Sequence, residues 1–191
     1  VIPAHNQSGV LPPFLTGSSP ATQSAMAPYR VSLLEATQRF ANGDARRKII
    51  QGLVAYRAEL RNEGITSGFQ WIDGSFVEDI EKNKGRPPND IDIITFAYRP
   101  PKYLDPIKWR DFIERRQDLF LPIECKKKYR CDAYYVDLNL QPEVLVSQTR
   151  YWFGLFSHQR ETFLWKGMLE IALGDDNDVI AFFNARGANA P

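Results

Sequence analysis

The sequence contains few residues that could form a zinc or disulfide framework. Only two cysteines and two histidines occur among 191 residues. Two thiols in a chain of this length, Cys125 and Cys131, are typical of a reducing cytosol, where they stay free. A structural zinc site needs about four ligands, so it is disfavoured even if His5 and His158 are counted. We therefore expect a cytoplasmic protein without structural zinc.

Long apolar runs and an excess of charge are missing as well. No run reaches the roughly 18 apolar residues that a membrane helix needs. The first residues, Val1–Ser8, lack the charged start and apolar core of a signal peptide. The net charge is +1, from 24 Lys and Arg against 23 Asp and Glu. A chain with such balanced charge has no overall electrostatic attraction to nucleic acid or to an anionic membrane. We therefore expect no membrane partner.

The composition suits one globular domain that follows an extended arm. Apolar residues make up 43% and charged residues 25%, which is near the average for globular proteins. Prolines at positions 3, 12, 13, 20 and 28 limit the start of the chain to extended or turn structure. We expect an N-terminal arm over residues 1–30 and a single domain over residues 31–191.

Helix and strand signals alternate along the predicted domain. A capping box at Ser32 and Glu35 starts the first helix, and Asp44 can cap the second, which ends before Gly64. Helices are predicted at about 32–41, 44–62, 76–82, 106–122 and 176–185, strands at about 69–73, 90–98, 131–140 and 166–173, a loop at 83–89 and a basic turn at 126–130. This alternation predicts an α/β (α+β mixed) fold, with one mixed sheet and helices packed on it.

Two aspartates alternate with isoleucines where the second strand is expected to begin, in Asp90-Ile91-Asp92-Ile93. Successive strand residues face opposite sides, so Asp90 and Asp92 project together. Paired acids on a strand are costly unless a cation neutralises them. Mg²⁺ suits them, because it takes one or two carboxylates together with substrate phosphates.

A Gly74-Ser75 pair lies between the first strand and the expected helix. Glycine lets the backbone approach a ligand closely, and amides at a helix start favour an anion. A phosphate cradle that faces a metal-binding acid pair is the outline of a nucleoside triphosphate site.

These residues resemble the signature of the nucleotidyltransferase superfamily of DNA polymerase β type. The signature is an apolar residue, Gly, then Gly or Ser, a spacer, and Asp-apolar-Asp. Here it is Ile72-Asp73-Gly74-Ser75 followed by Asp90-Ile91-Asp92. Two features depart from the pattern: Asp73 replaces an apolar residue, and the spacer is slightly long. The whole chain also resembles a group of uncharacterised bacterial proteins with this fold, in segments 9–13, 68–71 and 156–160.

The resemblance implies a nucleotidyltransferase-like sheet and a two-metal phosphoryl transfer. Asp90 and Asp92 would hold two Mg²⁺ ions, with a third carboxylate from a later strand. The candidates are Asp132 and Asp137, and Asp132 is preferred because it lies nearer the strand start, beside the other acids. Asp132 would also help to deprotonate the acceptor hydroxyl. The triphosphate contacts would come from Gly74, Ser75, Lys84 and Arg86.

The expected activity is transfer of a nucleoside monophosphate from a nucleoside triphosphate to a hydroxyl of an RNA, a protein or a small molecule. Minimal enzymes of this superfamily occur in toxin–antitoxin and defence settings, and a bound protein or RNA could serve as the acceptor. Two alternatives remain open. One is a nucleotide-binding or partner-binding module of the same fold without turnover. The other is an RNA-binding protein that uses the basic turn at 126–130.

Overall fold

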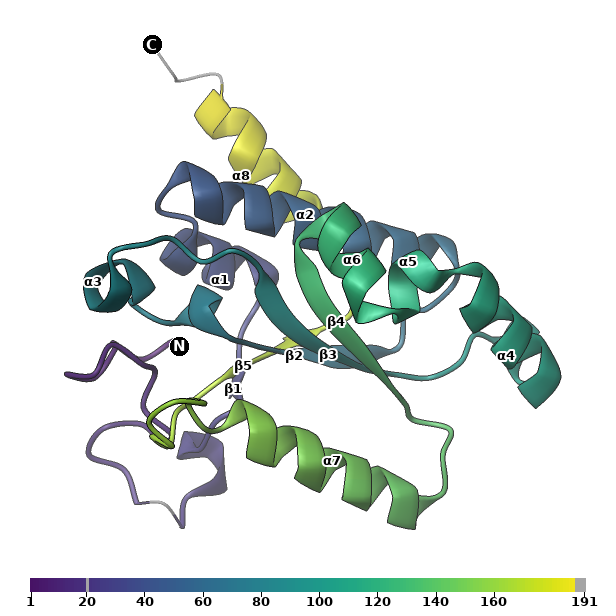
Figure 1. Cartoon of the computed structure of the whole chain (residues 1–191), viewed down its shortest axis with the longest axis horizontal. Coiled ribbons are helices and arrows are strands. Elements are labelled where there is room, and N and C mark those ends of the chain that lie inside the picture. The colour runs from purple at the N-terminus through teal and green to yellow at the C-terminus, as the bar shows by residue number, and fades with distance from the viewer. Residues whose placement is uncertain (20, 188–191) are drawn as a thin grey trace.

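The computed structural model describes residues 1–19 and 21–187 and has a five-stranded mixed sheet in the order β1-β5-β2-β3-β4 (Figure 1). Strand β2 is antiparallel to both β3 and β5, whereas β3 and β4 are parallel, as are β1 and β5. The strands are β1 (Tyr29–Arg30), β2 (Gly68–Asp73), β3 (Ile91–Ala97), β4 (Cys131–Asp137) and β5 (Leu169–Ala172). The predicted mixed α/β fold is confirmed.

Helices cover the two faces of the sheet unequally. Figure 1 shows α1, α2, α5, α6 and α8 on one side, and α7 on the other. The α-helices are α1 (Leu33–Phe40), α2 (Asp44–Asn62), α3 (Ile80–Lys84), α4 (Pro106–Arg115), α5 (Gln117–Phe120), α6 (Pro122–Tyr129), α7 (Pro142–Phe156) and α8 (Asn177–Gly187), and the 3₁₀ turns are η1 (Gln23–Ala25), η2 (Ser75–Val77) and η3 (Pro101–Tyr103). No helix among the described residues is long and apolar enough to cross a bilayer.

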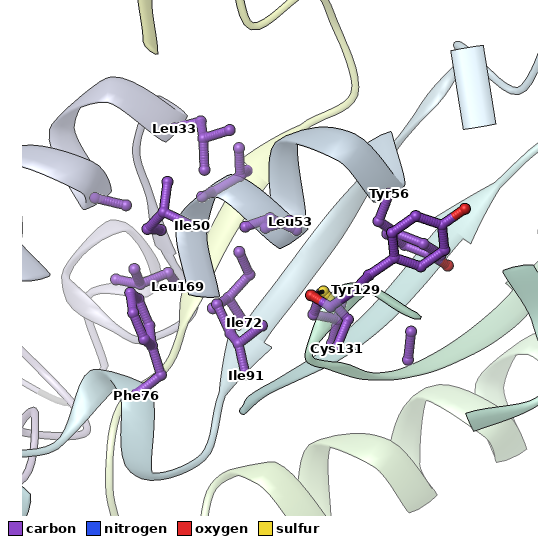
Figure 2. Packing of buried hydrophobic residues seen from close by; sticks show 14 of the residues in the cluster. Leu33, Ile50, Leu53, Tyr56, Ile72, Phe76, Ile91, Tyr129, Cys131 and Leu169 are labelled. Atoms are coloured by element: carbon purple, nitrogen blue, oxygen red, sulfur yellow. Dashed lines mark hydrogen bonds between the residues drawn. The ribbon is translucent and has the colours of Figure 1, made fainter. Parts of the chain in front are cut away.

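The strands bury apolar side chains on both faces, so the sheet separates two hydrophobic clusters. Ile72, Ile91 and Ile93 belong to the larger cluster, beneath α2. Figure 2 shows Ile50 and Leu53 of α2 close to this side of the sheet. The residues that alternate with these isoleucines along each strand face the other side of the sheet. The smaller cluster lies there, and α7 covers it with side chains that include Trp152, Phe153 and Phe156. The alternation of faces along each strand fixes which side chains can reach the α7 side.

The N-terminal arm is docked on the domain. Val10 and Leu11 are fully buried, and the Leu11 carbonyl accepts a hydrogen bond of 2.7 Å from the Gly167 amide. The Gly9 carbonyl accepts another, of 2.8 Å, from the amide of Asp79. The arm therefore supports the segment that follows the Gly74-Ser75 turn.

The helix predicted at 76–82 is wrong. The chain instead forms η2 and then α3, which continues to Lys84 into the segment predicted as a loop. The buried Arg46 guanidinium explains the break: it donates to the carbonyls of Phe76 (2.6 Å) and Glu78 (2.8 Å), which a continuous helix would use itself. Helix α3 ends because Gly85 takes a left-handed conformation, with φ at 62°.

The helix predicted at 106–122 and the basic turn predicted at 126–130 are also wrong. The first helix breaks at Arg116, whose guanidinium is bound by Glu59 (2.7 Å) and Asp118 (3.0 Å). A separate helix, α6, starts with proline at its first position and carries the lysines in its last turn, where cations favour the helix dipole. Only Arg130 leaves the helix, as a left-handed cap.

Other boundaries differ in smaller ways. Helix α7 was not predicted at all, because its start, Pro142, comes soon after a strand that we expected to reach residue 140. That strand ends at Asp137, whose carboxylate accepts from the Asn139 amide in a turn. Strand β5 covers only 169–172 of the predicted 166–173. The Ser32 capping box is confirmed, but Gly43 rather than Asp44 precedes α2 as its N-cap.

Candidate active site

Three aspartates form a row at one end of the neighbouring strands β2, β3 and β4. Asp73 of β2 is paired in register with Asp92 of β3, and Asp92 is paired with Asp132 of β4. Residues that lie opposite one another on neighbouring strands project to the same face, about 5 Å apart. All three line one cleft of about 610 Å³. The fold thus gathers carboxylates that lie up to 59 positions apart in the sequence.

Asp92 lies at the centre of this row, and its pKa is strongly raised. Burial, and then the charges of Asp73, Asp90 and Asp132, raise the pKa of Asp92 from 3.8 to about 7. Ionised acids packed this closely repel one another, so a cation in the cleft would be attracted to the row. Asp92 therefore has the electrostatic character of a group that needs a counter-ion.

Gly74 is required by the position of Asp92. Its φ is 78° and its ψ is −167°, a conformation that is nearly restricted to glycine. A Cβ at this position would lie 1.7 Å from Oδ2 of Asp92. The absence of a side chain at Gly74 therefore lets the Asp92 carboxylate lie directly against the Gly-Ser turn.

Asp90 comes immediately before β3 and also lines the cleft. Its carboxylate forms an ion pair with Lys126 of α6. Hydrogen bonding to Asp90 raises the pKa of Lys126, so the lysine is charged at neutral pH. Among the basic residues of α6, Lys126 therefore reaches the cleft and partly neutralises it.

Asp73 has a cation of its own. Nζ of the buried Lys166 lies 2.8 Å from Oδ2 of Asp73 and 3.0 Å from Oε1 of Glu78. Burial raises the pKa of Asp73 to about 6, still below neutrality. For Lys166, burial lowers the pKa but the two carboxylates raise it by more, so the ammonium stays charged. The charge of Asp73, where the superfamily signature has an apolar residue, is therefore balanced inside the protein.

The residues expected to contact phosphates line the same cleft: Gly74, Ser75, Lys84 and Arg86. The ammonium of Lys84 is 2.9 Å from the carboxylate of Glu161, and Arg86 donates to the Pro87 carbonyl. However, a three-residue 3₁₀ turn follows Gly74, so the expected helix N-terminus is not there to bind an anion. Any phosphate contact would come from the turn's backbone and these side chains.

Asp137 is far from the row along β4. It is paired in register with Ala97 at the other end of β3, and its carboxylate forms an ion pair with Arg99. The register thus places Asp132, and not Asp137, beside Asp92.

The donor set fits a hard cation in kind, because carboxylate oxygens are the ligands that Mg²⁺ prefers. In the described part of the chain, no three or more His, Cys, Asp or Glu side chains are already arranged to hold a metal ion. Asp90 would have to release Lys126 before it could bind one. A site built from one or two carboxylates and substrate oxygens agrees with this arrangement.

Several cleft residues were not predicted to belong to the site. Lys166 is distant in sequence from the motifs, Glu78 lies three residues after Ser75 without belonging to the signature, and the prediction places Lys126 in a basic turn. Phe163 gave no signal at all. The sequence signal for Lys166 was Asp73, an additional acid beside the Gly-Ser pair, because a buried carboxylate needs a cation to pair with.

The protein is thus a mixed α/β protein whose sheet carries a row of carboxylates beside a Gly-Ser turn. The chain belongs to the family described as "Family of unknown function (DUF6932)", whose match covers residues 3–172. No curated protein matches the chain, and neither does any solved structure.

Proposed function

We propose that this protein is a nucleotidyltransferase that moves a nucleoside monophosphate from a nucleoside triphosphate to a hydroxyl acceptor in RNA, a protein or a small molecule. The observation that carries the proposal is the register of Asp92 and Asp132, directly beside the Gly74-Ser75 turn. Opposed carboxylates next to a glycine turn that lines the same cleft can serve a metal-bound triphosphate.

Asp92 and Asp132 would hold Mg²⁺, and Asp90 would join them after releasing Lys126, with two ions in the full arrangement. When bound, these ions would supply positive charge against the triphosphate and the developing negative charge of the reaction. The raised pKa of Asp92 supports this assignment, since a cation would relieve the repulsion within the row.

The chain's own groups account for binding and proton transfer. Arg86 and Arg160 line the cleft and would attract the triphosphate, and Lys84 would do so after leaving the carboxylate of Glu161. The acceptor hydroxyl oxygen attacks the α-phosphorus, the bond to the bridging oxygen breaks, and pyrophosphate leaves. The hydroxyl proton passes to the carboxylate of Asp132, which then returns it to water. Gly74 contributes by leaving room at the turn.

The ion pairs of the basic segment weigh against the RNA-binding alternative. Lys126 is paired with Asp90, and Lys128 lies 2.7 Å from Asp118. Cations engaged in this way offer less to a phosphate backbone, because each must first leave its carboxylate. A module without turnover shares the whole site and is separated from the enzyme only by an activity measurement.

The test is transfer of label from α-³²P nucleoside triphosphates to cellular RNA and protein in the presence of Mg²⁺. We expect transfer by the wild type, none with Asp92→Asn, and normal transfer with Asp111→Asn, which removes an exposed carboxylate on α4. Binding of triphosphate without transfer by any of the three would favour the inactive module. Absence of both binding and transfer would refute the proposal.

A further inference from the structure

The segment between α7 and β5 forms a second wall of the cleft, and this wall differs from the row of acids in its side chains. His158 and Trp165 pair as an antiparallel bridge, which closes residues 159–164 into a short loop. The cleft is lined there by the loop residues Gln159, Arg160, Glu161 and Phe163. This wall bears an aromatic ring as well as charged groups.

Phe163 has an unusual backbone and an unusual exposure. Its φ is 55°, a left-handed conformation that bulky residues rarely adopt, and its side chain is 81% exposed. An exposed ring gains little from burial on folding, and the backbone around it is strained. The folded chain alone gives no reason for a phenylalanine at this position.

The surrounding contacts hold the loop in this shape. The Phe163 amide donates to the Gln159 carbonyl at 2.8 Å, and the Gln159 amide donates to the Leu164 carbonyl at 2.9 Å. The Gln159 side chain in turn donates to Glu78, at 3.1 Å, on the floor of the cleft. The ring is therefore presented by a fixed loop that is tied to the carboxylate–lysine cluster below it.

A second exposed apolar side chain lines the same cleft. Leu155, near the end of α7, is 46% exposed. Phe163 and Leu155 thus provide apolar surface within a cleft whose other lining residues are mostly charged. A ligand with a charged part and a flat apolar part would match both kinds of surface.

We propose that Phe163 is the stacking platform for the nucleobase of the triphosphate. This inference rests on the proposed function and adds to it the part of the site that holds the base. Stacking on an aromatic face accepts every base, so we expect binding of all four nucleotides, with purines bound more tightly because their rings are larger.

The experiment compares two ligands, Mg²⁺-ATP and Mg²⁺-tripolyphosphate, by titration calorimetry. Loss of one stacking contact weakens binding by about five- to 150-fold. Phe163→Ala should weaken ATP binding by this factor and leave tripolyphosphate binding unchanged. Phe163→Tyr keeps an aromatic face and should bind ATP like the wild type. Ile107→Ala, which removes an exposed apolar side chain from α4, is the matched control and should change neither affinity.

A glycine variant separates the ring from the backbone. Phe163→Gly removes the ring and also relieves the positive φ, so its melting temperature should equal or exceed that of the wild type. Its ATP affinity should nevertheless fall as much as that of Phe163→Ala. A variant that is no less stable yet binds more weakly is the pattern expected of a strained binding residue.

The outcomes separate this inference from the proposed function. If the wild type binds ATP and tripolyphosphate equally well and Phe163→Ala changes neither, the stacking platform is refuted while the proposed function stands. If Phe163→Ala weakens both ligands equally, the residue only shapes the loop and stacking is refuted again. If the wild type binds neither ligand, both proposals fail.

Discussion

Replacing Asp92 with asparagine should stabilise the metal-free protein at neutral pH. Raising a carboxyl pKa from 3.8 to about 7 corresponds to a cost on the order of 4 kcal/mol for the ionised form. Asp92 is only partly buried and opens onto the cleft, where solvent and salt screen its charge. We therefore expect the amide, which has nearly the same shape, to add about 2 kcal/mol to the free energy of unfolding.

The gain should depend on pH in a defined direction. The folded protein holds a proton on Asp92 up to about pH 7, whereas the unfolded chain loses it near pH 4. Between these values the folded state binds more protons, so the contribution of Asp92 to stability falls as the pH rises. It is fully present below about pH 4 and lost above about pH 7. Asp92→Asn should remove this decline.

Urea unfolding, followed by circular dichroism in EDTA at pH 5 and pH 8, measures the effect. With a slope of about 2 kcal/mol per molar urea, the midpoint of Asp92→Asn at pH 8 should lie about 1 M above that of the wild type. At pH 5 the two midpoints should lie closer together. Asp111→Asn controls for removal of a negative charge on an exposed helix.

Parallel stability curves for wild type and Asp92→Asn would refute this reasoning. They would mean that the Asp92 carboxylate ionises in the folded protein as easily as in the unfolded chain. The row of acids would then be too well solvated to attract a cation. A Mg²⁺ addition supplies a second check, since it should stabilise the wild type at pH 8 and have little effect on Asp92→Asn.

Further predictions concern the residues around Asp92. Gly74→Ala should cost about 1–3 kcal/mol in urea unfolding, because of its backbone conformation, and should abolish label transfer by displacing the Asp92 carboxylate. Lys166→Met leaves two buried carboxylates without their cation and should cost about 3–5 kcal/mol at pH 8; a melting temperature that is no more depressed at pH 8 than at pH 5 would contradict this. Asp132→Asn should abolish label transfer, whereas Asp137→Asn should lower stability but keep transfer per folded molecule; the reverse result would make Asp137 the third carboxylate.

Local signals in the sequence predicted most of the sheet. Strands β2 and β3 are rich in β-branched and aromatic residues between clear breakers, and their predicted bounds differ from the structure by one residue at each end or less. The error after the Gly-Ser turn came from a long-range contact. Arg46, about thirty positions away, takes the carbonyls that a helix after the Gly-Ser turn would have used. No local pattern at 76–82 contains that information.

The candidate site residues likewise fall into those that local sequence patterns indicate and those that only the fold brings together. Asp90, Asp92 and Gly74 were identified because their chemistry depends on spacing along the chain. The pairing of Asp132 with Asp92 needed a strand register, which the sequence suggested only through the position of Asp132 near a strand start. Lys166 opens the strand predicted at 166–173, which the structure starts only at Leu169, and Phe163 lies where no element is predicted. They entered the site only through the fold.

The row of acids is not uniform, and its asymmetry indicates where a substrate would lie. Asp73, on the β5 side, is neutralised by Lys166 and tied through Glu78 to the Phe163 loop. Asp92, in the middle, has a strongly raised pKa, and on the β4 side Asp132 adds to that shift. Lys166 balances the Asp73 end, so a cation would bind toward β3 and β4, where it would compete with Lys126 for Asp90. The phosphates would follow the cation, and a base attached to them could then reach the loop that presents Phe163. Under the proposed function, the internal ion pair of Asp73 would give the cleft a direction, with the metal and the acceptor toward β4 and the nucleobase toward the Phe163 loop.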